Sequence, residues 1–188
     1  INPLFIQNDA EKAASLLVFS GLTRITDGTK VQPDLAKSWT ISKNGLVYSF
    51  KLKNNINWHD GGKFTADDVI YTIGLIQNDD TKSSLESVWK GVKVEKINDY
   101  EVEFTLPNPY PNFLTVANQV ILPQHALSTV SDVKNIKIAE FFNAPIGTGP
   151  YKFVRFDQVG SQSEAIFKRN DNFALGKPYI QQIKIVTY

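Results

Sequence analysis

Two kinds of hydrophobic spacing alternate along the chain. Between Asp9 and Phe19, apolar residues recur at steps of three and four, which predicts a helix with one buried face that ends before Gly21. The same spacing predicts a second helix over residues 65–77. Short helices are predicted near residues 113–117 and after Pro123, where prolines interrupt longer regular structure.

Elsewhere the spacing is two, which is typical of strands. Alternating apolar and polar residues flank the Asn44-Gly45 and Asn98-Asp99 pairs, so both regions are predicted to be hairpins. An apolar strand is expected at residues 120–122. The last third alternates again over residues 151–157, 163–171 and 179–187. The pattern predicts a mixed α/β domain of the α+β type, with a mixed sheet, hairpins and short helices.

The stretch "NWHDGGKFTADDV" concentrates a histidine and three acids just before the second helix. Thr65 occupies an N-cap position, and Asp68 lies three residues later, where its carboxylate can bind the backbone N–H of the cap. Residues 59–62 read as a turn, in which Asp60 bonds the backbone and a glycine takes positive φ. This interpretation gives the acids structural roles.

The alternative is a metal-dependent hydrolase that uses His59, Asp60 and His125, the second of the two histidines. Adjacent ligands on an extended chain point in different directions, and no HxxxH or HExxH spacing accompanies them. We therefore expect no catalytic residues, no metal ligands and no cofactor.

Charge and composition exclude several kinds of binding partner and site. Across 188 residues, 20 basic and 19 acidic side chains nearly balance, and no basic run exceeds two residues, so a nucleic acid is not expected as a partner. The absence of cysteine excludes disulfides and thiolate metal sites. No apolar run is long enough to span a bilayer. Any membrane association is expected to come from an anchor outside this chain.

Six motifs occur in an order that points to a family. They are "VFSGLTRI", "VQPDLAKSWTIS", "LVYSFKLKNNINWHDGGKFTADDVIYT", "VILPQHAL", "PIGTGPYKFVRF" and "FKRNDNFALGKPYIQQIKI". Together they resemble the family 5 extracellular solute-binding proteins, the oligopeptide, dipeptide and nickel receptors of bacterial ABC importers. The resemblance covers nearly the whole chain.

The resemblance implies a fold and a domain organisation. Family members have two lobes, one built from domains I and II and the other from domain III, and they enclose the ligand between domains I and III. By analogy, residues 1–19 and 124–188 supply part of domain I, the ligand-cleft lobe, and residues 20–123 form domain II, a scaffold domain. Because family members are much longer, we expect an N-terminal fragment, a partial periplasmic-binding-protein-like lobe without the second lobe.

The resemblance also implies a function and contact residues. It implies capture of a peptide or a related small solute by lobe closure, followed by delivery to the permease subunits of an importer, without catalysis. The location would be extracellular or periplasmic, with a lipid anchor in the full-length protein. Ligand contacts are expected at Gln7, Asn8, Asp9, Asn118 and Gln119, although Asn8 and Asp9 also suit helix capping. A structural interaction module is the other alternative.

Overall fold

The computed structural model describes residues 1–130 and 132–188. Its α-helices are α1 (Asp9–Val18), α2 (Ala66–Gln77), α3 (Glu86–Trp89), α4 (Phe113–Val116) and α5 (Gln124–Leu127). Short 3-10 helices are η1 (Asp79–Thr81), η2 (Val133–Ile138) and η3 (Glu140–Asn143). Within the described residues, no helix has the length and apolar character needed to cross a membrane.

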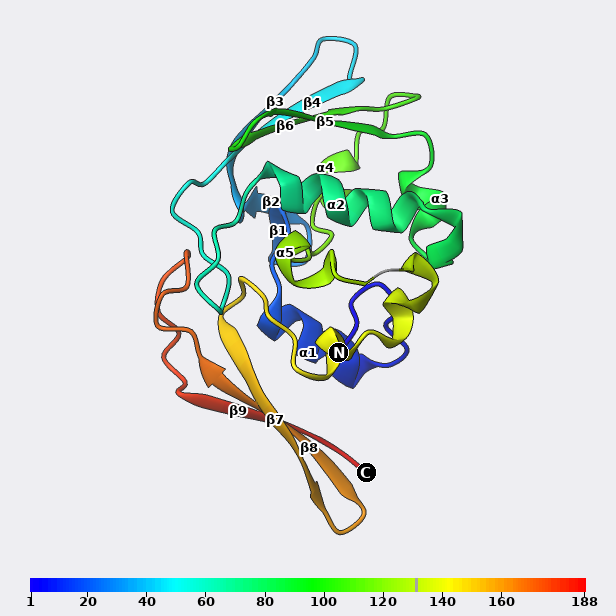
Figure 1. Cartoon of the computed structure of the whole chain (residues 1–188). Coiled ribbons are helices and arrows are strands. Elements are labelled where there is room, and N and C mark those ends of the chain that lie inside the picture. The colour runs from blue at the N-terminus through cyan, green and yellow to red at the C-terminus, as the bar shows by residue number, and fades with distance from the viewer. Residues whose placement is uncertain (131) are drawn as a thin grey trace.

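A four-stranded antiparallel sheet forms one side of the molecule (Figure 1). Its strand order is β3-β4-β6-β5, from β3 (Ala36–Ile41), β4 (Val47–Leu52), β5 (Lys93–Asn98) and β6 (Glu101–Thr105). The two predicted hairpins are its outer pairs, and β4 and β6 join them at the centre. Helix α2 runs beneath this sheet, because its side chains bury one apolar face there.

A separate three-stranded antiparallel sheet lies at the opposite end of the molecule (Figure 1). Its order is β7-β8-β9, from β7 (Tyr151–Val159), β8 (Gln162–Arg169) and β9 (Gln182–Thr187). Helix α1 packs beside this sheet, with Ala14, Ser15 and Val18 buried. Between the two sheets, β1 (Thr23–Thr26) and β2 (Lys30–Pro33) form a small hairpin.

The chain crosses itself where α1 ends. Gly21 forms an antiparallel bridge with Val120, and the backbone of Ser20 accepts a hydrogen bond from Ile121 at 2.9 Å. A Cβ on Gly21 would lie only 2.5 Å from the carbonyl oxygen of Asn118, so this close approach requires glycine. The crossing brings the residues before and within α1 next to the segment that follows α4.

One continuous hydrophobic cluster extends from Leu4 to Phe167 and joins both sheets. The strand aromatics Tyr48, Phe50 and Phe167 are buried in it, and so is Trp58. Rings stack edge to face within the cluster, for example Phe50 against Phe104 at 5.6 Å between centroids.

The predicted α+β class is confirmed, with three corrections in detail. The described strand pairs are antiparallel throughout, rather than part of one mixed sheet, because most neighbouring strands are joined by tight turns. The apolar run at residues 120–122 forms a single bridge rather than a strand. The β1–β2 hairpin was not predicted, although its turn residues Asp27 and Gly28, both at positive φ, are a recognisable hairpin signal.

Candidate binding site

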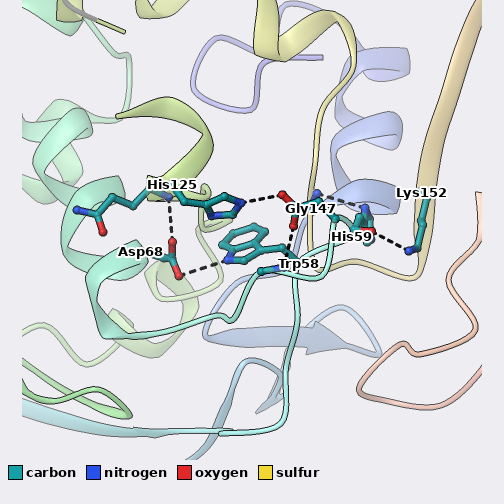
Figure 2. Close-up of polar contacts among 9 residues, drawn as sticks. Trp58, His59, Asp68, His125, Gly147 and Lys152 are labelled. Atoms are coloured by element: carbon teal, nitrogen blue, oxygen red, sulfur yellow. Dashed lines mark hydrogen bonds and ion pairs between the residues drawn. The ribbon is translucent and has the colours of Figure 1, made fainter. Parts of the chain in front are cut away.

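The buried carboxylate of Asp68 connects three parts of the chain. It accepts the backbone N–H of Thr65 at 2.9 Å, which confirms the capping box at the start of α2. It also accepts the backbone N–H of Gln124 at 2.9 Å and the indole N–H of Trp58 at 3.3 Å (Figure 2). Burial raises the pKa of this carboxyl, and the three donors oppose that rise. Asp68 therefore holds α2, α5 and the preceding loop together.

His59 binds the loop that follows η3 through both ring nitrogens. Nδ1 accepts the backbone N–H of Gly147 at 3.2 Å, so the proton is on Nε2, which donates to the carbonyl of Gly149 at 3.1 Å. Burial lowers the pKa of the imidazole to about 4, against the opposing effect of the Gly149 carbonyl. The backbone carbonyl of His59 also accepts a bond from Lys152 at 2.9 Å (Figure 2). His59 thus has no ring nitrogen left for a metal.

Asp60 turns away from His59 toward α5. Its Oδ1 accepts the backbone N–H of Gly62 at 3.0 Å, and Gly61 takes a φ of 96°, which confirms the predicted turn. Its Oδ2 lies 2.8 Å from Nε2 of His125. Partial desolvation would raise the pKa of Asp60, but the bonds from His125 and Gly62 hold it below its ordinary value.

This arrangement does not support the hydrolase alternative. Figure 2 shows the rings of His59 and His125 directed at different partners. Among residues 1–130 and 132–188, no group of three or more histidine or acidic side chains could hold a metal ion. The histidines and acids of this region fasten a turn, a helix start and a loop.

The expected contact residues around the start of α1 do not gather in one hollow. Asn8 is the N-cap of α1 and accepts the backbone N–H of Glu11 at 2.9 Å. Asp9 lies in the first helical turn, where a negative charge complements the helix dipole. Asn8 lines a hollow of about 230 Å³ beside β8 and β9, whereas Gln7 lines another of about 220 Å³ beside η2 and η3. All three side chains are exposed.

Asn118 and Gln119 do lie together, in a groove of about 310 Å³ between α1, α3 and α4. Both are half-buried, and the one side-chain hydrogen bond of Gln119 within residues 1–130 and 132–188 is a long bond of 3.4 Å to the carbonyl of Val120. The crossing of the chain at Gly21 sets this position, because it carries the segment after α4 against the flank of α1.

Sequence reasoning missed the remaining walls of this groove. Ile6 comes from the loop before α1, Lys12 and Leu16 come from α1, and Val88 comes from α3. The sequence did contain a signal for the α1 residues. Lys12 and Leu16 are four positions apart, so they lie on the same face of the helix, and a leucine on a face that also carries a lysine is exposed to solvent. The approach of α3 is a long-range packing event that no local pattern indicates.

Comparison with known proteins identifies the fold. The sequence profile described as bacterial extracellular solute-binding proteins, family 5, middle region, matches residues 30–188. The oligopeptide-binding protein AppA of Bacillus subtilis is 34% identical over 186 residues, which cover 97% of this chain and 34% of that protein. The structure of AppA in complex with a nonapeptide superposes with a TM-score of 0.91 at 31% identity, over 100% of this chain and 37% of that one.

A structure with a bound nickel complex also shares the fold. NikZ of Campylobacter jejuni, solved in complex with Ni(L-His), has a TM-score of 0.86 at 40% identity, over 97% of this chain and 36% of that one. The chain thus spans about a third of the length of the relatives it matches. Because the family profile matches most of the sequence and the fold agrees, this chain belongs to the family 5 bacterial extracellular solute-binding proteins.

Proposed function

We propose that this chain is part of the substrate-binding component of an ABC importer, which captures peptides or a related small solute and delivers them to the permease subunits. The observation that carries the proposal is the similarity of nearly the full chain to the oligopeptide-binding protein AppA of Bacillus subtilis. The structure of that protein holds a nonapeptide, and NikZ holds Ni(L-His), so both ligand classes enter the proposal. The protein binds its ligand without making or breaking bonds.

We further propose the division into residues 1–19 and 124–188 as part of domain I and residues 20–123 as domain II. The four-stranded sheet falls wholly within the second range and the three-stranded sheet within the first, which supports this boundary. On this proposal, ligand capture brings a further lobe over domain I, and contacts on both faces stabilise the closed state. The chain is then the N-terminal fragment of a receptor that lies outside the cytoplasm and carries a lipid anchor.

Calorimetric titration of the full-length gene product tests the function. A pool of di- to nonapeptides, or Ni(L-His), is expected to give saturable binding, and mass spectrometry is expected to recover the ligand intact. Hydrolysis of the bound peptide, or no binding of either ligand class, would contradict the proposal. A purely structural module would bind neither ligand class.

The proposed ligand contacts are Gln7, Asn8, Asp9, Asn118 and Gln119. Asn118 is the sharpest test, because it lines the groove and lies outside any helix cap. Asn118→Ala is expected to weaken solute binding about three- to tenfold, the effect of one hydrogen bond of about 1 kcal/mol, with an unchanged melting temperature.

Two further asparagine variants separate ligand binding from folding: Asn8→Ala is read for stability alone, because Asn8 is itself a proposed contact, and Asn54→Ala is the control for binding. Asn8→Ala is expected to lower stability by about 1 kcal/mol through loss of the cap. Asn54→Ala, at an exposed position outside the groove, should change neither stability nor binding. Unchanged affinity in Asn118→Ala would remove Asn118 from the contact set.

A further inference from the structure

The groove between α1, α3 and α4 is lined by apolar side chains that remain exposed to solvent. Three large apolar side chains line it while remaining about half exposed: Ile6 at 43%, Leu16 at 55% and Val88 at 49%. They come from three separate elements, so their gathering is a product of the fold. Apolar side chains that are left exposed and concentrated in one hollow mark a contact surface.

The charged side chain that lines the groove is positive. Among the described residues that line it, Lys12 is the one charged side chain, and no acid is present. None of the ion pairs formed within residues 1–130 and 132–188 involves Lys12. Asn118 and Gln119 add amide donors. The groove therefore complements a carboxylate that lies next to an apolar group, and it repels an ammonium group.

The size of the groove limits what it can hold. At about 310 Å³, it lies at the lower end of the ~300–1,000 Å³ typical of small-molecule sites. It can take one terminal residue of an extended ligand, but not a long peptide in full. The carboxylate and the apolar side chain that the walls complement occur together at the C-terminal residue of a peptide.

We propose that this groove binds the C-terminal end of a peptide ligand, with Lys12 binding the terminal carboxylate. Ile6, Leu16 and Val88 then contact the last side chain and select for an apolar one. This inference rests on the proposed function and makes it more specific. Lys12 is thereby a specificity-determining residue for the solute.

Two random-sequence pentapeptide libraries test the inference on the full-length protein. One library has free C-terminal carboxylates and the other has C-terminal amides. The wild type is expected to retain mainly free acids, enriched in Leu, Ile, Val and Phe at the last position. By calorimetry on the best retained peptide, Lys12→Gln should weaken binding about tenfold or more and bring the acid and the amide to similar affinity.

Matched variants distinguish carboxylate binding by Lys12 from an effect on folding and from an effect of the net charge of the protein. Lys12→Arg keeps the positive charge and should retain the preference for the acid. Lys43→Gln removes an exposed lysine from the β3–β4 turn and should leave binding unchanged. Thermal melting of Lys12→Gln should match that of the wild type.

The outcomes against the inference are distinct from those against the function. If the wild type retains acids and amides equally, or if Lys12→Gln binds as the wild type does, the inference fails and the proposed function stands. Such a result is expected if another part of the protein covers the groove, or if the groove takes the amino end of the peptide. If the wild type retains neither library, the peptide-binding function fails, and this inference fails with it.

Discussion

Oδ2 of Asp68 lies 3.3 Å from the indole nitrogen of Trp58, and both side chains are almost completely buried. Oδ1 of the same carboxylate binds the backbone of Gln124, 56 residues away in sequence. A residue that begins as a local helix cap therefore also fixes the packing of α5 and of the loop before α2.

Asp68→Asn is expected to destabilise the protein by about 2–3 kcal/mol. The amide keeps one acceptor oxygen but directs an NH₂ group toward buried donors, which leaves them unsatisfied. Urea unfolding of Asp68→Asn against Asp67→Asn measures the difference. Asp67 lies next to it but forms only an exposed ion pair with Lys96, so its substitution should cost less than about 1 kcal/mol. Equal losses in the two variants would contradict the central role of Asp68.

His59→Ala is expected to lower stability by about 2–3 kcal/mol and to leave the bound metal content unchanged. The variant loses two ring hydrogen bonds to the loop at Gly147 and Gly149. Denaturant unfolding measures the stability, and elemental analysis by mass spectrometry measures the bound metal content. His125→Ala, which removes a partly exposed contact with Asp60, is the control and should cost less than about 1 kcal/mol. Metal lost from His59→Ala would revive the hydrolase alternative.

The same histidine should make stability depend on pH. Its pKa in the folded protein is about 4, below the ordinary value of 6.5, so the unfolded chain binds more protons between these values. The contribution of neutral His59 is complete above about pH 6.5 and is lost as the pH falls toward 4. His59→Gln should flatten the stability curve over this window. A curve with the wild-type slope would show that His59 is not held neutral.

Asp34 has the opposite dependence on pH. Burial raises its pKa from 3.8 to about 6, against the opposing charges of Lys53 and Arg24, and its Oδ1 has no partner among the described residues. The folded state therefore favours the protonated form, and this contribution is lost as the pH rises through 6. Asp34→Asn should stabilise the protein by about 2 kcal/mol at pH 7.5 and have little effect near pH 4. Chemical unfolding at both pH values measures this, and a loss of stability at pH 7.5 would contradict it.

Gly147→Ala should destabilise the protein severely, by more than about 3 kcal/mol. A Cβ there would lie 1.8 Å from the carbonyl oxygen of Val18 at the end of α1, so the loop or the helix must move. Gly74→Ala is the matched control: it lies in α2 with open space around it, and alanine should stabilise the helix by about 0.5–1 kcal/mol. Thermal melting of the two variants should shift in opposite directions, and a tolerated Gly147→Ala would show that this contact is loose.

Local patterns predicted elements whose determinants lie close together in sequence. The Asn44-Gly45 turn, the capping box of Thr65 and Asp68, and the Asp60 turn all formed as expected, because each needs partners within a few residues. The candidate site was predicted only in part. Asn118 and Gln119 share a groove, whereas Gln7 and Asn8 line separate hollows, because the side chains around a helix start point in different directions.

By itself, the sequence determined the α+β class, most helices and hairpins, and the family. Periodicity, capping and turn residues act over short distances, and ordered motifs preserve ancestry. Only the tertiary structure decided which distant groups meet. It paired His59 with Gly147, brought Gln124 to Asp68, and placed Lys12 beside Asn118 and Val88. These contacts depend on how whole elements pack around a shared core, and that packing is a property of the complete chain rather than of any short segment.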